Sequence, residues 1–94
     1  MSLTETTIQI PTEHMANVFG QFDAYIKKIE RAFQVTAVMR DGSMKLLGSE
    51  GQVARAHRTL DQLLALSQRG NAITEQNVDY AIALTFEEIG RAHV

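Results

Sequence analysis

The side chains in this sequence that could bind a ligand are mainly basic, and they gather in one stretch. The local basic cluster consists of Lys27, Lys28 and Arg31, with Arg40 and Lys45 further along the chain. Lysine and arginine bind phosphate oxygens, so a strip of them on a helix can follow a nucleic-acid backbone. The alternative is a solvated helix face, with Glu30 and Asp23 partly neutralising the positive charge.

A short loop, Gly20–Asp23, precedes this cluster. Its glycine permits a positive φ or a close backbone approach. Phe22 and Tyr25 could offer a surface on which a base stacks. They also share a helical spacing with Ile26 and Ile29, and that spacing favours packing in the core.

No catalytic or metal site is predicted. The chain has no cysteine, which excludes thiolate zinc sites and cysteine catalysis. His14, His57 and His93 are far apart and form no H-x-x-x-H or H-E-x-x-H spacing. The serines lack a G-x-S-x-G context. The sequence therefore predicts a chain that is not an enzyme.

Length and composition are those of one globular domain. The chain has 94 residues and a net charge of −2, so nucleic acid would need a local basic patch rather than a global field. No apolar run reaches the roughly 18 residues of a membrane helix, and no signal peptide begins the chain. We expect a cytoplasmic protein that makes no contact with membranes.

The first half of the chain predicts a strand followed by two helices. Thr6–Ile10 alternates as a half-buried strand does. Thr12 is expected to cap a helix that ends at Gly20, and Asp23 to cap the next one. The apolar stripe of that second helix contains Phe22, Tyr25, Ile26, Ile29 and Phe33.

The second half predicts a hairpin and two more helices. Strands at Val35–Met39 and Met44–Leu47 are joined through Asp41-Gly42, a strong signal for a tight turn. Ser49 begins an S-x-x-Q capping box. The inner stripe of the following helix is Val53, Ala56, Leu60, Leu63, Leu64 and Ser67.

The last helix is predicted to follow a C-cap at Gly70 and an N-cap at Thr74. Its apolar face consists of Val78, Ala81, Ile82, Phe86 and Ile89. This face could close the core or pair with a second copy through Phe86, Ile89 and Val94. Strands and helices that do not alternate strictly indicate an α+β layer fold.

The order β-α-α-β-β-α, with a glycine loop between the first two helices, resembles the KH nucleic-acid-binding domain. In that domain a G-x-x-G loop clamps the nucleic-acid backbone. The matching residues are Gly20-Gln21-Phe22-Asp23, followed by Ile26–Glu30. The whole chain resembles more closely the N-terminal segment of the bacterial-type PhoH-like (phosphate starvation-inducible) proteins. That likeness rests on Ile8–Pro11, Asn17–Asp23, Ile26–Glu30, the Arg40–Gly48 hairpin and Val53–Ala56.

The resemblance implies a three-stranded KH-like sheet covered by helices, with an extra C-terminal helix. Residues 1–94 would form a single domain, the N-terminal fragment of a larger ATPase. PhoH-like proteins bind ATP and Mg²⁺ in a downstream P-loop domain, and this chain contains no G-x-x-x-x-G-K-[ST]. We therefore expect a non-catalytic accessory module without a cofactor of its own.

The ligand implied by the resemblance is RNA or single-stranded nucleic acid, and a downstream ATPase domain is the implied protein partner. The candidate binding residues are Gly20, Gln21, Phe22, Lys27, Lys28, Arg31 and Arg40. The alternative is a docking or oligomerisation domain that binds no nucleic acid.

One position departs from the KH pattern, because Asp23 replaces the second glycine of the loop. A carboxylate about 4 Å from a phosphate would be repelled by about 1 kcal/mol in water and about 4 kcal/mol at an effective dielectric near 20. A helix cap is worth roughly 1 kcal/mol. This comparison favours Asp23 as a cap rather than a phosphate contact.

Overall fold

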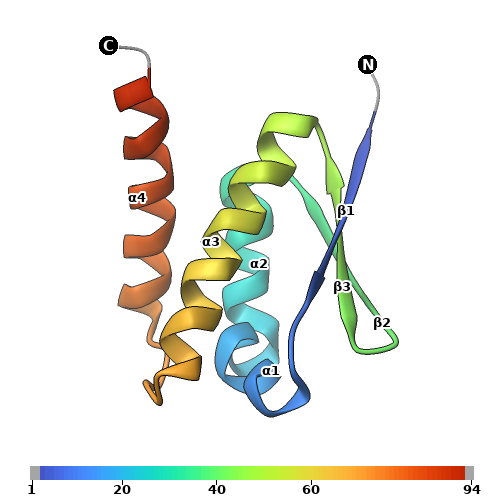
Figure 1. Cartoon of the computed structure of the whole chain (residues 1–94), viewed down its shortest axis with the longest axis vertical. Helices are drawn as coiled ribbons and strands as arrows, with labels where there is room; N and C mark the ends of the chain where they lie inside the picture. Colours follow the sequence, from blue (N-terminus) through green and yellow to red (C-terminus); the bar gives the residue numbers. More distant parts are fainter. Residues whose placement is uncertain (1–2, 93–94) are drawn as a thin grey trace.

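The computed structural model describes residues 3–92, and side chains for residues 3–87. Figure 1 shows the elements, which run in the order β1 (Thr4–Gln9), α1 (Thr12–Phe19), the 3₁₀ turn η1 (Gln21–Asp23), α2 (Ala24–Phe33), β2 (Thr36–Arg40), β3 (Ser43–Gly48), α3 (Glu50–Gln68) and α4 (Glu75–Ala92). The predicted α+β class and element order are confirmed. Within the described part, no helix is both long and apolar enough to cross a bilayer.

The three strands form one antiparallel sheet in the order β1-β3-β2, so β3 is central. The hairpin turn is at the predicted place, with positive φ at both Asp41 (50°) and Gly42 (80°). The register pairs Ile8 and Met39 with Met44. Because side chains alternate across a strand, these three residues share one face of the sheet.

The helices cover that inner face, and α4 lies beside α3 on the side away from β1 (Figure 1). The buried core consists of Ile8, Ile10, Val18, Ile26, Ile29, Phe33, Val35, Met44, Leu46, Val53, Ala56, Leu60, Leu63, Ile73, Val78 and Ala81. Most of the predicted stripe of α3 is buried there, and Leu64 packs against its margin. Ile89 and Val94 lie outside the residues whose side chains are described.

The last helix closes the core of its own chain. Phe86 stacks on the buried Phe33, with ring centroids 5.2 Å apart. The buried hydroxyls of Thr59 and Thr85 lie 2.9 Å apart and hydrogen-bond between α3 and α4. Within the described side chains, the apolar face of α4 therefore packs on α2 and α3.

Asp23 and Ser49 lie at the predicted N-cap positions of α2 and α3, whereas the N-cap of α1 is Pro11 rather than Thr12. Thr12 and Ser49 lie at the helix starts, but neither side chain makes a capping hydrogen bond, and the same is true of Asp23. Thr74 does cap α4: its Oγ1 accepts from the Asn77 amide at 3.1 Å. The Asn77 side chain accepts in return from the Thr74 amide at 2.9 Å, so each residue satisfies a free donor of the other.

Candidate nucleic-acid interface

The glycine loop between α1 and α2 depends on Gly20. This residue has φ 79° and ψ 169°, a region that only glycine adopts readily. A Cβ at this position would lie 2.7 Å from the ring of Tyr25. The Tyr25 hydroxyl in turn donates to the carbonyl of Ile73 at 3.1 Å. The Tyr25 ring therefore packs against the backbone of Gly20, and its hydroxyl links the loop to the connection between α3 and α4.

Phe22 does not pack in the core, so that part of the predicted stripe is wrong. Phe22 and Asp23 both adopt left-handed φ values, 55° and 58°, which turn the chain before α2 begins at Ala24. Phe22 thus precedes the helix, and helical spacing does not apply to it. Its side chain is 84% exposed. The loop presents an aromatic ring to solvent beside the unburied Gln21.

Asp23 lies at the N-cap position of α2, but its carboxylate bonds no amide of the first turn. The left-handed backbone at this residue explains the difference, because cap residues with the usual geometry are extended. The loop amide of Asp23 instead donates to the Gly20 carbonyl at 3.1 Å. Among the residues that the structure describes, the Asp23 carboxylate has no hydrogen-bond or ion-pair partner.

Replacing Asp23 with glycine is therefore expected to leave the stability unchanged or raise it by up to about 1 kcal/mol. A side chain in a left-handed conformation costs roughly 1–2 kcal/mol, and glycine avoids that cost. Urea unfolding of the wild type and of Asp23→Gly measures the difference. A loss near 1 kcal/mol would mean that the carboxylate does cap α2 in solution.

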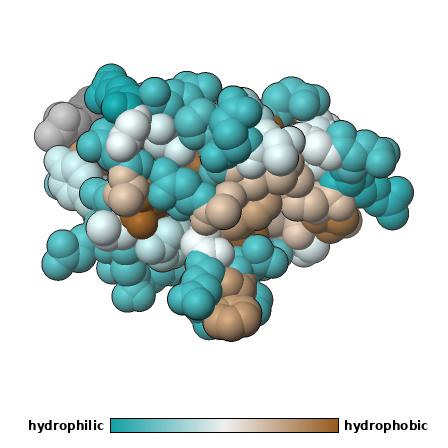
Figure 2. All heavy atoms as spheres, turned by 90° about the horizontal axis from the view of Figure 1, so that it is seen from below, coloured by the Kyte–Doolittle hydropathy of each residue, from teal (hydrophilic) through white to brown (hydrophobic). Residues whose placement is uncertain are grey.

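A small groove lies between this loop and the hairpin. Its volume is about 150 Å³, and the residues that line it are Phe19, Asp23, Ile26, Ala37, Met39 and Met44. The first three come from the two helices and the loop between them, and the last three from the inner face of β2 and β3. Figure 2 shows this end of the molecule from below, where hydrophilic side chains surround an apolar area at the middle of the view. The groove is lined mainly by apolar side chains, and Asp23 is the one charged residue in its wall.

The structure divides the predicted basic cluster. Lys27 and Arg31 are exposed one turn apart on α2. Lys28 points instead to α4, where its ammonium lies 2.6 Å from Asp79 Oδ1 and 3.7 Å from Glu75 Oε2. The hydrogen bond to Asp79 raises the pKa of Lys28 above its usual value. Lys28 thus remains charged at neutral pH, but that charge is compensated from α4.

Glu30 has a structural partner. Its Oε2 accepts a hydrogen bond from the backbone amide of Ala37 at 2.8 Å. Glu30 therefore bridges α2 to the outer edge of β2 at the wall of the groove. Lys27 and Arg31 are left as the exposed cations of α2 on the surface next to this bridge.

Arg40 and Lys45 lie on the other face of the sheet. Arg40 pairs with Ser43, and Val38 pairs with Lys45, and in both pairs the side chains point away from the inner face. Lys45 also lies 4.0 Å from Glu5 of β1. Of the predicted site residues, Gly20, Gln21 and Phe22 lie in or next to the loop, and Lys27 and Arg31 are exposed on the helix that follows it. Lys28 is paired with α4, and Arg40 lies on the outer face of the sheet.

Each histidine with a described side chain has a polar partner on another residue. His14 Nδ1 lies 2.7 Å from the Ser67 hydroxyl, and His57 Nδ1 lies 2.9 Å from Asp61 Oδ2. Within the described residues no three potential metal ligands cluster.

Sequence reasoning missed the sheet side of the groove. Ala37, Met39 and Met44 were predicted only as strand residues. The alternation of β2 was the available signal, since Ala37 and Met39 fall on one face. Their position opposite Phe19 and Ile26 depends on how α2 packs on the sheet, which the sequence pattern did not specify.

Comparison with known proteins finds a solved structure with a similar fold and several relatives named PhoH-like proteins. A crystal structure of a protein of unknown function from Aeropyrum pernix superposes with a TM-score of 0.72, covering 97% of this chain and 50% of that one. At 11% sequence identity, this likeness concerns the fold alone. No protein-family model matches the chain.

The PhoH-like protein of Bacillus subtilis is 31% identical over 68 residues, which is 72% of this chain and 21% of that protein. PhoH-like proteins of Mycobacterium tuberculosis and Mycobacterium leprae are 24% identical over 79 residues, or 84% of this chain. The chain spans about a fifth of the length of these relatives. The predicted resemblance is confirmed: over most of its length the chain is related to PhoH-like proteins.

Proposed function

We propose that this chain is the accessory module of a PhoH-like protein and binds RNA or single-stranded nucleic acid in the groove between α2 and β2. The observation that carries the proposal is the exposed Phe22 at the glycine loop, next to the groove and to the helix that bears Lys27 and Arg31. The predicted KH resemblance supports it. The ATP site of such a protein would lie in a separate domain.

Each part of this surface has a distinct task in the proposal. Phe22 stacks on one base, a contact worth about 1–3 kcal/mol. Lys27 and Arg31 contact phosphates along α2, and the apolar groove receives a second ring. Asp23 lies within the groove wall and opposes phosphate there, so phosphates follow the helix rather than the loop.

Removing both cations in the variant Lys27→Ala/Arg31→Ala should weaken binding of short single-stranded RNA by about 2- to 30-fold, as expected for two exposed ionic contacts. The log–log salt slope should become shallower by about 0.7 for each phosphate that the variant no longer neutralises. Fluorescence anisotropy across a salt series measures both quantities.

The matched control is Arg40→Ala/Lys45→Ala, which removes the same charge from the outer face of the sheet. We expect it to bind like the wild type. An equal loss of affinity in both double variants would show that binding follows net charge and not this surface. No binding by the wild type at low salt would favour the alternative of a protein-docking domain.

A further inference from the structure

The two edges of the sheet differ in how they are protected. An edge strand presents unpaired amides and carbonyls to which another strand can bind. The edge of β2 is covered at Ala37, whose amide donates to the Glu30 carboxylate at 2.8 Å. The opposite edge is β1, and within the described residues its outer side lacks such a cover.

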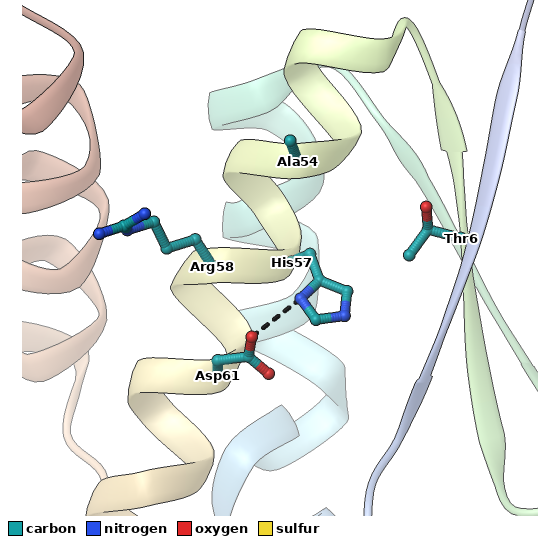
Figure 3. Close-up of a pocket in the computed structure, with 5 residues that line it drawn as sticks. All are labelled: Thr6, Ala54, His57, Arg58 and Asp61. Atoms are coloured by element: carbon teal, nitrogen blue, oxygen red, sulfur yellow. Dashed lines mark ion pairs between the residues drawn. The ribbon is translucent and has the colours of Figure 1, made fainter. Parts of the chain in front are cut away.

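The β1 edge carries few of the usual obstacles to pairing. Figure 3 shows Arg58 pointing toward α4 and away from β1. Among the other described residues, no side-chain hydrogen bond reaches the backbone of Thr4–Gln9. The strand has no proline or lysine, and its threonines and isoleucine favour extended structure. Its single charge, Glu5, lies on the outer face next to Lys45 of the central strand. The edge is therefore suited to accept another strand.

An open groove of about 400 Å³ runs between β1 and α3 beneath this edge. Figure 3 shows Thr6 facing the helix, with Ala54, His57 and Asp61 on the opposite wall. His57 Nδ1 and Asp61 Oδ2 lie 2.9 Å apart, one helical turn from each other. Ala54 is exposed and small, so another helix can approach closely here.

The polar pair on this wall, His57 and Asp61, could exchange partners with the same pair of a second copy related by a two-fold rotation. If β1 pairs antiparallel with β1 of a second copy, the two α3 helices also run antiparallel beneath the joined strands. A two-fold axis that passes between His57 and Asp61 would place each His57 opposite Asp61 of the partner subunit. We propose that β1 and the adjoining surface of α3 (Ala54, His57 and Asp61) form the interface of a symmetric dimer in which two three-stranded sheets join into one.

This interface is separate from the proposed nucleic-acid surface, because the groove beside β2 lies at the other edge of the sheet. The dimer leaves both such grooves open at the two ends of the joined sheet. The proposal stands whether or not the chain binds nucleic acid.

The first test is the molar mass of the purified chain over a wide concentration range, by sedimentation equilibrium. We expect the mass of the wild type to rise from one copy to two. Ala54→Arg should remain a monomer, because a long charged side chain would separate the two α3 helices. Ala83→Arg, the same change at an exposed alanine of α4, should dimerise like the wild type. A wild type that stays monomeric, or an Ala54→Arg variant that dimerises normally, overturns the proposal.

The second test uses the absence of cysteine from the chain. Residues directly opposite each other in an antiparallel pair have Cα atoms about 4.5–5.5 Å apart, within the range of a disulfide. A residue lies opposite its own copy only on the two-fold axis, so Thr6→Cys or Thr7→Cys should give covalent dimers under mild oxidation if the axis passes through it. If the axis lies between them, an equimolar mixture of the two variants should give the covalent dimer instead. Thr36→Cys, an exposed threonine of the β2 edge, is the control and should not. Covalent dimers formed only by Thr36→Cys would place the interface at the β2 edge and contradict the proposal.

Discussion

Replacing Phe33 with alanine is expected to lower the free energy of unfolding by about 3–5 kcal/mol, the usual cost of deleting a buried aromatic ring. The Phe33 side chain is fully buried in the core, and its ring stacks on Phe86 of α4 with a centroid separation of 5.2 Å. The deletion therefore weakens the packing of α2 and of α4 together. Urea unfolding followed by circular dichroism measures the change in midpoint.

The same substitution at Phe22 is the matched control, since it deletes the same atoms from a ring that is 84% exposed. We expect a change of no more than about 0.5 kcal/mol, as at most surface positions. If Phe22→Ala were as destabilising as Phe33→Ala, the glycine loop would have to pack inward in solution.

Replacing Gly20 with alanine is expected to lower the free energy of unfolding by about 2–4 kcal/mol. Two effects add here: the backbone at φ 79° and ψ 169° is strained for any residue with a Cβ, and that atom would lie 2.7 Å from the Tyr25 ring. The ring is held by its hydrogen bond to Ile73, so it cannot move aside freely. Thermal unfolding of Gly20→Ala against the wild type tests this expectation.

Gly51→Ala separates these effects from the general consequence of replacing a glycine. Gly51 lies in the first turn of α3, and nothing lies within 4 Å of a Cβ built there. Alanine should be neutral or stabilise by up to about 1 kcal/mol through its helix propensity. Equal losses of stability at Gly20 and Gly51 would contradict the role given to Tyr25.

Local patterns were sufficient to predict the order of the elements. The Asp41-Gly42 turn, the alternation of the strands and the periodic stripe of α3 each depend on residues close in sequence. Thr74 was predicted as an N-cap from its residue type, and its bonds to Asn77 span only four residues. Strand bounds shifted by one or two residues, and the strand order could not be predicted because it depends on long-range pairing.

The candidate site was predicted less well, because its geometry depends on packing between distant elements. The sequence placed Lys28 in the same basic cluster as Lys27, but its ammonium pairs with the carboxylates of Glu75 and Asp79 on α4. The exposure of Phe22 follows from two consecutive left-handed residues, which no propensity rule predicted for Phe22-Asp23. Glu30 was expected in solvent, but its partner belongs to a strand that follows α2.

The attachment of α4 bears on how short a stable version of this chain can be made. A piece that stops after α3 would expose the face of Phe33 that Phe86 now covers, and the Thr59 hydroxyl would lose its bond to Thr85. Lys28 would lose both of its carboxylate partners. The elements from β1 to α3 are thus not a self-sufficient minimum, and truncation experiments should keep the chain at least through Phe86.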